Sequence, residues 1–236
     1  MGLGPVDRRS GIGWITVLVL AVDTSTPTVT TGVAEVTPHR AVDVRAERRV
    51  DTPRGHAEIL TSLILECLTE AGIARFDLDA VVVGAGPGPF TGLRVGMATA
   101  AGFADALAIP LHGVCSLDAI RFDAHVQRVL VVTDARRREV YWALYGPDGR
   151  VAGPAVDTPA DLIDRLRGEQ DVDAILGSPE HTRLFGGHAV DGYAAPTTAG
   201  LAATARRALE SGAAPEPVVP LYLRRPDAVE LKDRKR

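Results

Sequence analysis

The feature that most constrains the fold is a strand-and-turn pattern that occurs twice in the chain. Val17–Asp23 (VLVLAVD) is an almost continuous apolar run that ends in an aspartate at a turn rich in Thr and Ser. A run of this length and β-branched composition is typical of a strand buried on both faces. Val129–Asp134 (VLVVTD) has the same character, and alternating strands follow both runs, at Thr28–Val36 and Val140–Tyr145. The pattern favours an internal duplication, although an apolar strand followed by an Asp turn also arises by coincidence.

Helices separate the strands. In His56–Ala71 the apolar residues recur at three- and four-residue spacing, Gly72 is the expected C-cap, and Leu65 widens the apolar arc beyond one core face. A second helix is predicted at Thr91–Leu107. The order strand–strand–strand–helix–strand, seen twice, predicts an α/β protein with mixed sheets in the pattern of the actin-like ATPase (ASKHA, ribonuclease H-like) fold. Further strands are predicted at 42–50, 80–84, 111–114 and 174–177, and further helices at 117–124, 159–167 and 198–211.

The chain divides into four predicted segments. We expect a disordered extension at 1–15, an N-terminal lobe at 16–115, a C-terminal lobe at 116–224 and a charged tail at 225–236. Arg8 and Arg9 precede an apolar stretch, as in export signals, but Asp23 and a polar turn follow in place of a small-residue cleavage site. A buried first strand explains the stretch better, and the chain is expected to be cytoplasmic and not bound to membranes.

Composition narrows the function classes. The 236 residues carry a net charge of −4, which disfavours nucleic-acid binding by the chain on its own. Cys67 and Cys115 lie in apolar runs and are expected to be small buried hydrophobic residues in a reducing compartment, with a disulfide as the less favoured alternative. No cysteine and histidine spacing typical of zinc occurs in the sequence.

A glycine-rich loop, Gly86–Arg94 (GPGPFTGLR), joins a predicted buried strand to the second helix. Such a loop presents backbone N–H groups and a helix dipole to an anion, and Thr91 is placed to cap the helix. A rigid turn that aims the helix is an equally good reading, because the prolines remove two donors. At the end of the first strand, a carboxylate is placed to hold a magnesium–water shell. The candidate nucleotide or anion residues are Asp23, Gly86, Gly88, Thr91, Gly92 and Arg94.

The second helix carries small residues on one line, Gly92, Gly96, Ala100 and Ala104, at four-residue spacing. Small residues allow another helix to approach closely. The helix is apolar or small almost all round, so it is expected to bury two faces, one on its own sheet and one against a partner. The alternative is a fully internal helix.

Catalytic constellations are missing from the sequence. The six histidines are scattered, and neither HExxH nor GxSxG occurs. The turn of the second half, Asp134–Glu139, is rich in arginine where a phosphate-binding turn would be rich in glycine. Its arginines, Arg136–Arg138, are suited to gripping phosphates, but on an exposed hairpin they are more often solvated. We therefore assign neither a catalytic residue nor a metal site.

Taken together, these segments closely resemble the TsaB (YeaZ) family. The matching stretches are VLAVDTSTPTVTTGV, RGHAEILTSLI, AVVVGAGPGPFTGLRVGMATAAGFADALAIPLHGVCSL, VTDARRREVYWALYG and PLYLR, in order from Val17 to Arg224. Two departures stand out: Ala57 occupies a position where Ser is common, and Pro89 replaces the usual Ser of the glycine loop.

The resemblance implies an actin-like fold of two lobes, the second degenerate. It also implies a non-catalytic subunit of the complex that makes threonylcarbamoyladenosine at position 37 of tRNA. It implies pairing with a TsaD-like catalytic subunit through the first two helices, docking of a TsaE-like ATPase, and homodimerisation when the partner is absent. ATP or ADP would bind only at the complex interface, the isolated subunit would hold no cofactor, and tRNA would be reached only through the complex. The residues expected at the partner interface are His56, Leu60, Leu63, Gly96, Ala100 and Phe103.

Two other classes remain as alternatives. An actin-fold kinase would need a complete pair of phosphate turns, and a glycoprotease-like hydrolase would need metal-binding histidines. An RNA-binding module is opposed by the acidic balance of the chain.

Overall fold

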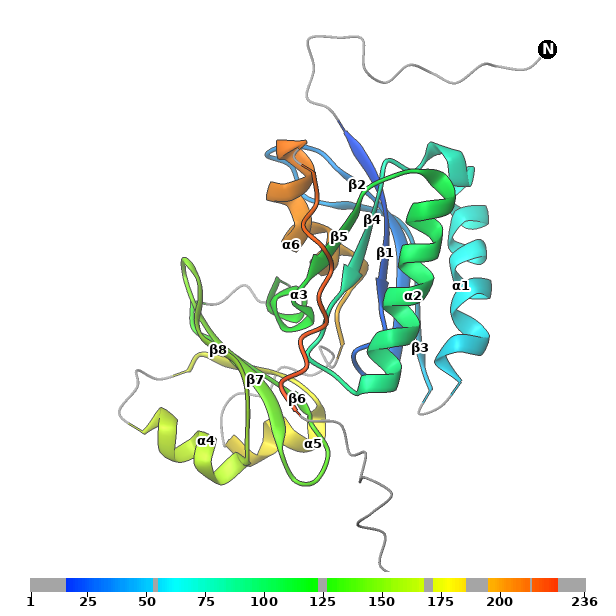
Figure 1. The fold of residues 1–236 in the computed structure, drawn as a ribbon. Helices are drawn as coiled ribbons and strands as arrows, with labels where there is room; N and C mark the ends of the chain where they lie inside the picture. The colour runs from blue at the N-terminus through cyan, green and yellow to red at the C-terminus, as the bar shows by residue number, and fades with distance from the viewer. Residues whose placement is uncertain are drawn as a thin grey trace, which may run out of the picture.

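The computed structural model describes residues 16–52, 55–122, 127–167, 172–185, 195–212 and 214–224. The predicted extension at 1–15 and the predicted tail at 225–236 lie outside these residues. Two sheets, one above the other in Figure 1, organise the described chain. The predicted α/β class with two mixed sheets is confirmed.

The first sheet has the strand order β3-β2-β1-β4-β5. β1 (Val17–Asp23) pairs antiparallel with β2 (Thr28–Val36) and parallel with β4 (Ala80–Gly84). β3 (Asp43–Asp51) and β5 (Leu111–Val114) form the two edges. Helices α1 (His56–Ala71) and α2 (Phe90–Leu107) cover one face, and Figure 1 shows them side by side. Because both faces are covered, the apolar residues of β1 from Leu18 to Val22 are fully buried.

The second sheet repeats this topology with one strand fewer. Its order is β8-β7-β6-β9, with β6 (Val129–Asp134) antiparallel to β7 (Val140–Gly146) and parallel to β9 (Ala174–Gly177). β8 (Gly149–Asp157) pairs with β7, and α4 (Pro159–Leu166) leads into β9. No described strand of the second sheet corresponds to β5, which is the sense in which the second lobe is degenerate.

The duplication extends to hydrogen bonds. Asp23 at the end of β1 accepts a bond from the backbone N–H of Ser25 at 2.8 Å. Asp134 at the end of β6 accepts the equivalent bond from Arg136 N–H at 2.7 Å. Both aspartates thus close the same local turn, in which a carboxylate accepts the N–H two residues on. The repeated topology and the repeated turn support duplication over coincidence.

Two elements, β8 and α5 (Pro179–Thr182), were given no residue range from the sequence. β8 contains Gly149, Gly153 and Pro154, residues that normally mark turns, and most of its residues lie at or near the surface. Proline and glycine are tolerated there because β8 is an edge strand with register irregularities beside Trp142 and Leu144. The second element is the one-turn helix α5 (Pro179–Thr182) after β9.

The helix α6 (Thr198–Ser211) lies elsewhere than its place in the sequence suggested. The sequence put it in the second lobe, but Leu201, Ala202 and Ala205 pack on the first sheet against Val19 and other β1, β2 and β4 residues. Its neighbour α3 (Ser116–Phe122) lies against it and reaches both sheets. Whether the lobes divide at residue 115 stays a prediction, since the chain returns to the first sheet through α6.

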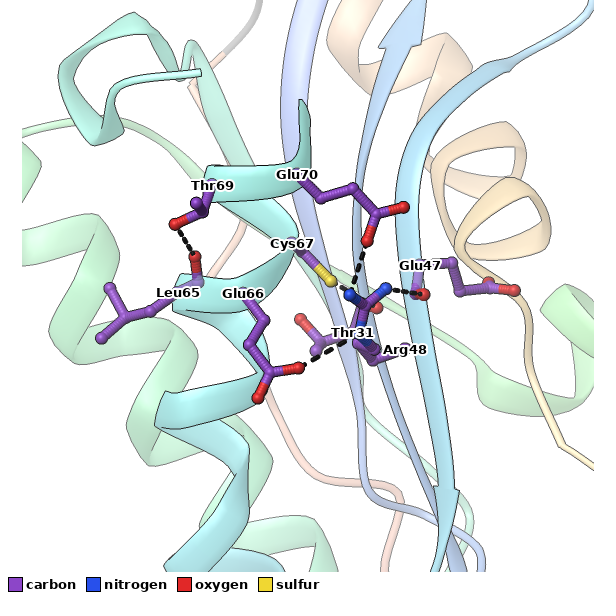
Figure 2. Close-up of polar contacts among 8 residues, drawn as sticks. All are labelled: Thr31, Glu47, Arg48, Leu65, Glu66, Cys67, Thr69 and Glu70. Atoms are coloured by element: carbon purple, nitrogen blue, oxygen red, sulfur yellow. Dashed lines mark hydrogen bonds and ion pairs between the residues drawn. The ribbon is translucent and has the colours of Figure 1, made fainter. Parts of the chain in front are cut away.

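A polar cluster fastens α1 to β3 (Figure 2). Arg48 on β3 reaches Glu66 and Glu70 on α1, and it also donates to the carbonyl of Glu47. Beneath it, the Cys67 thiol donates to the Thr31 carbonyl of β2 at 3.6 Å. These ion pairs are exposed to solvent, which screens them, so they contribute little to stability. Leu65 points away from the cluster, and the helix therefore presents an apolar side chain on its outer face.

The two cysteines are not bonded to each other. Cys67 is buried and Cys115 is half-buried, and both are free thiols. Burial raises the pKa of each thiol to about 11. The expectation of small hydrophobic thiols is confirmed.

Candidate functional site

The best-defined polar centre of the first lobe is the carboxylate of Asp23, which is completely buried. Its Oδ1 accepts hydrogen bonds from Ser25 N–H at 2.8 Å and from Ser25 Oγ–H at 2.7 Å. Its Oδ2 accepts from Ser116 Oγ–H at 2.6 Å, and Ser116 Oγ in turn accepts from Gly86 N–H at 3.2 Å. The carboxylate therefore ties the end of β1 to the glycine loop and to the start of α3.

This environment leaves the carboxylate in a balance of opposing effects. Burial raises the pKa of Asp23, and the hydrogen bonds from Ser116 and Ser25 oppose that rise. Little space remains beside it, because a side chain at Gly84 would place its Cβ 1.7 Å from Oδ2. A magnesium–water shell at Asp23 would have to break one of these internal bonds, so the contacts favour a structural role.

The glycine loop packs inward. Gly86 and Gly88 are buried, and a Cβ at Gly88 would lie 2.3 Å from the carbonyl oxygen of Ser25. α2 begins at Phe90 with Pro89 as the N-cap residue and no side-chain cap, so the expectation that Thr91 caps the helix is wrong. The helix starts one residue earlier than the sequence indicated, which puts Thr91 inside its first turn. These contacts support the alternative of a rigid turn that aims α2.

The predicted anion residues do not surround one opening. Asp23, Gly86, Gly88 and Gly92 are buried, whereas Thr91 and Arg94 are exposed on α2. The guanidinium of Arg94 lies over the ring of Phe90, 4.7 Å from its centroid. A nucleotide at this loop stays a prediction that no contact in the described chain supports.

The small-residue line of α2 faces the interior of this chain. Gly96 N–H donates to Thr24 Oγ1 at 3.0 Å, and the Thr24 hydroxyl donates to the Gly92 carbonyl at 2.7 Å. A Cβ at Gly96 would lie 2.3 Å from Thr24 Oγ1, and Ala100 is fully buried in the core. The placement of Gly96 and Ala100 at a partner interface is therefore corrected: their lack of bulk admits the turn after β1.

Two further residues predicted at the interface also belong to the core. Leu60 is 0% and Leu63 is 9% exposed, and both pack under α1 with β-strand residues. Phe103 is partly buried against the same cluster, and His56 is half-buried beside Gly92. The apolar period of a helix marks its inner face first, and these residues follow that rule.

The outer face of the two helices is different in kind. α2 exposes Ala98, Ala101, Gly102 and Ala106, and a Cβ at Gly102 would meet nothing within 4 Å. On α1, Leu65 is 51% exposed. We call these five residues the outer face. Apart from Asp105, which is also exposed on this side of α2, these positions are small and apolar where solvent-facing helix positions are usually charged.

Sequence reasoning missed three groups. Ser25 and Ser116 hold Asp23, and the signal for Ser25 was its place in the polar turn. Phe90 and Tyr222 stack with ring centroids 5.0 Å apart, although they lie far apart in the chain. Asp118 accepts from Tyr145 Oη–H at 2.7 Å and from Arg150 at 3.0 Å, a contact between α3 and the second sheet that no sequence pattern marked.

The Asp118 contact borders a groove of about 680 Å³ between β5, α6 and residues 214–221. Small and apolar side chains form much of its wall, and the charged groups of Asp118 and Arg150 are already paired with each other. Burial raises the pKa of Tyr145. The groove contains none of the predicted anion residues. Its lining includes Ala85, His112, Cys115, Thr204, Val218 and Leu221.

Two features are absent from the described residues. They contain no group of three or more His, Cys, Asp or Glu side chains placed to hold a metal ion. Among the helices that the structure describes, none has both the length and the apolar character needed to cross a membrane.

Comparison with known proteins identifies the family. A family model described as "TsaD: tRNA N6-adenosine threonylcarbamoyltransferase" matches residues 50–224. The chain belongs to this family. Its resemblance to the TsaB (YeaZ) proteins is also confirmed, and with it the actin-like fold. The solved structure of YeaZ from Pseudomonas aeruginosa superposes with a TM-score of 0.70 at 27% identity, covering 88% of this chain and 100% of that one.

Two proteins similar in sequence illustrate how much of the chain the relatives cover. An uncharacterized protein of Mycobacterium tuberculosis is 51% identical over 213 residues, which is 90% of this chain and 94% of that protein. The Escherichia coli tRNA threonylcarbamoyladenosine biosynthesis protein TsaB is 38% identical over 100 residues, which is 41% of this chain and 43% of that protein.

The two faces of α2 make opposite predictions for the same substitution. Gly96→Ala should destabilise the protein by about 1–3 kcal/mol, because the new methyl group overpacks against Thr24. Gly102→Ala should stabilise it by about 0.5–1 kcal/mol, because alanine favours the helix and Gly102 has open space around it. Denaturant melts of both variants beside the wild type measure the difference. Equal stability of the two variants would contradict the inward orientation of the Gly96 line.

The buried carboxylate predicts a pH dependence. The pKa of Asp23 is raised in the folded protein, so its protonation favours folding. This contribution to the free energy of unfolding is complete below the unfolded pKa, near 4, and is lost as pH rises through the folded pKa. Relative to Asp23→Asn, which does not titrate, the wild type should gain stability on acidification from pH 7 to pH 4. Parallel stability curves for the two proteins would rule out the raised pKa.

Proposed function

We propose that this chain is a non-catalytic partner subunit of the tRNA N6-adenosine(37) threonylcarbamoyltransferase complex, and that it pairs with a TsaD-like catalytic subunit through α1 and α2. The observation that carries the proposal is the outer face. Small residues at Ala98, Ala101 and Gly102 admit the backbone of a second helix at close range, and Leu65 on α1 supplies an exposed apolar side chain.

The interior of the fold supports the same conclusion. In an actin-like enzyme the first aspartate turn would face substrate. Here both carboxylate oxygens of Asp23 already accept hydrogen bonds from Ser25 and Ser116. The matching turn of the second lobe presents arginines. A kinase needs both turns open to phosphates and metal, so the geometry favours a subunit that positions another enzyme.

Membership of the family supports the partner's identity. The family model is named for the threonylcarbamoyltransferase, and the E. coli relative is named for threonylcarbamoyladenosine biosynthesis. Because a TsaD-like subunit would share this fold, the pairing is expected to be helix pair against helix pair. A second copy of this chain would use the same face when that subunit is absent, and a TsaE-like ATPase is expected to join the complex.

The outer face makes a prediction that separates binding from folding. Gly102→Leu should abolish or strongly weaken the complex, because a bulky side chain cannot fit where two helix backbones meet. The melt of the isolated chain should stay nearly unchanged, because a Cβ there touches nothing. A tagged copy is co-purified from its own cell extract and run on size exclusion, with Gly102→Ala as the matched control. A Gly102→Leu chain that still recovers the TsaD-like subunit in full would refute this interface.

The closed Asp23 turn makes a second prediction. The purified chain alone should neither hydrolyse ATP appreciably nor modify tRNA, as measured by phosphate release and by analysis of tRNA nucleosides. Turnover that disappears on Asp23→Ala, in a variant shown to be folded, would establish an actin-fold enzyme and overturn the proposal.

A further inference from the structure

Basic and aromatic side chains from distant parts of the chain meet on one side of the molecule. Tyr222 lies against Phe90, and the guanidinium of Arg94 lies over the Phe90 ring. Two residues on, Arg224 donates to the Ala135 carbonyl at 2.7 Å and pairs with Glu139 at 3.2 Å. Residues 222–224 thus connect the aromatic pair to the loop between β6 and β7. We call the resulting surface the basic strip: Phe90, Arg94, Tyr222 and Arg136–Arg138.

The loop holds its arginines in an unusual backbone conformation. Arg136, Arg137 and Arg138 have φ values of 60°, 51° and 65°, all in the left-handed region. A non-glycine residue in this region costs roughly 1–2 kcal/mol, and three in succession need support from their surroundings. Asp134 supplies it by accepting Arg136 N–H, and Glu139 N–H and Arg136 O close the turn at 3.0 Å. Arg224 fixes the turn from outside.

The strip is cationic in a chain that is acidic overall. Arg136, Arg137 and Arg138 are exposed. Of the two carboxylates in this turn, Asp134 accepts the backbone N–H of Arg136 and Glu139 pairs with Arg224. A rigid turn that aims guanidinium groups outward is suited to phosphate oxygens, which arginine recognises with paired N–H donors. The neighbouring rings are about 40% exposed, at Phe90 and Tyr222, which leaves them available to a planar ligand.

Phosphate binders beside exposed aromatic rings match one ligand class better than others. Single-stranded nucleic acid offers both a chain of phosphates and unstacked bases, and proteins bind it with basic grooves and aromatic platforms. A duplex would use the arginines but offer no base to the rings. We propose that the basic strip is a contact surface for RNA, in which Arg136–Arg138 bind phosphates of an unpaired loop and Tyr222 stacks on a base. The inference rests on the proposed function, which makes a tRNA loop the RNA in question.

Arg136–Arg138 and Tyr222, the residues tested below, lie outside α1 and α2, which carry the outer face, whereas Arg94 lies one helical turn from Ala98. The two surfaces can therefore be tested independently. The acidic balance of the chain predicts that RNA binding by the isolated protein is weak and salt-dependent, and the strip names the residues that produce the dependence.

The first experiment removes charge and keeps the turn. Arg136→Asn, Arg137→Asn and Arg138→Asn are combined in the full chain, because asparagine tolerates the left-handed region better than most residues. Binding of a fluorescein-labelled tRNA transcript with adenosine at position 37 is measured by anisotropy at several salt concentrations. The triple variant should bind about tenfold more weakly or worse, and the slope of log K against log[salt] should fall by about two. The control combines Arg45→Gln, Arg75→Gln and Arg207→Gln, which changes net charge equally and should leave the slope unchanged.

The second experiment tests stacking. Tyr222→Leu should weaken binding of a stem–loop RNA about tenfold with no change in salt slope, and should not affect a duplex RNA of the same length. Equal loss in the triple variant and its control, or equal effects of Tyr222→Leu on both RNAs, would overturn the inference.

Complex formation separates the two proposals. The Asn triple variant should still co-purify with the TsaD-like subunit. If it loses that subunit while its RNA slope is unchanged, the strip is a protein contact and the inference is wrong, although the proposed function survives. If the wild-type chain never recovers the TsaD-like subunit, the proposed function fails, and the salt slopes still decide whether the strip binds RNA.

Discussion

The structure depends on the burial of one carboxylate among hydroxyl groups. Asp23 accepts three hydrogen bonds from Ser25 and Ser116, and these connect β1, the loop after β4 and the start of α3. A buried carboxylate without such partners would cost several kcal/mol, so the turn, the glycine loop and α3 have to be placed together. In the second lobe the equivalent Asp134 keeps the backbone bond but has a side chain that is 38% exposed. The repeated turn is therefore closed and buried in the first lobe, whereas in the second lobe it is partly exposed and rich in arginine.

α2 packs on the buried turn after β1 with one side and is exposed on the other. On its inner line, Gly92 and Gly96 form hydrogen bonds with Thr24, the residue directly after Asp23. Its outer line is small and exposed. Contact with Thr24 accounts for the glycines on the inner line, and the proposed partner contact accounts for the small residues on the outer line.

Much of the fold was predictable from the sequence, because hydrophobic period and turn residues fix local structure. The apolar runs ending in Asp23 and Asp134 predicted the two central strands, and Gly72 marked the end of α1, where it adopts φ 65° and caps the helix. β8 was missed because Gly153 and Pro154 resemble a turn. An edge strand with an irregular register accepts both residues, but edge position is decided by the other strands and not by the segment itself.

The candidate site was less predictable for a physical reason. Four-residue spacing shows that Gly96 and Ala100 share a line, but close approach of a partner and close approach of the chain's own turn demand the same small residues. The side was decided by Thr24, which is distant in sequence. Leu65 was the better signal for the outer face, since an apolar residue outside the core arc has no internal explanation. In the same way α6 is a good amphipathic helix by pattern, yet which sheet it covers depends on the path of the chain.

Residues 214–224 join these features without forming a helix or strand. Val218 packs into the core of the first lobe, where a Cβ at Gly113 would lie 2.8 Å from it, and Leu221 N–H donates to the Ala85 carbonyl at 2.8 Å. Leu223 then packs into the second lobe, and Arg224 ends on the β6–β7 loop. The segment is visible in Figure 1 as the red coil that runs from the end of α6 to β6. Tyr222 lies between Leu221, which bonds to the first lobe, and Leu223 and Arg224, which contact the second lobe. The segment that connects the lobes therefore also brings Phe90 and Tyr222 to the arginines. A change in the angle between the lobes would therefore separate the two halves of the basic strip.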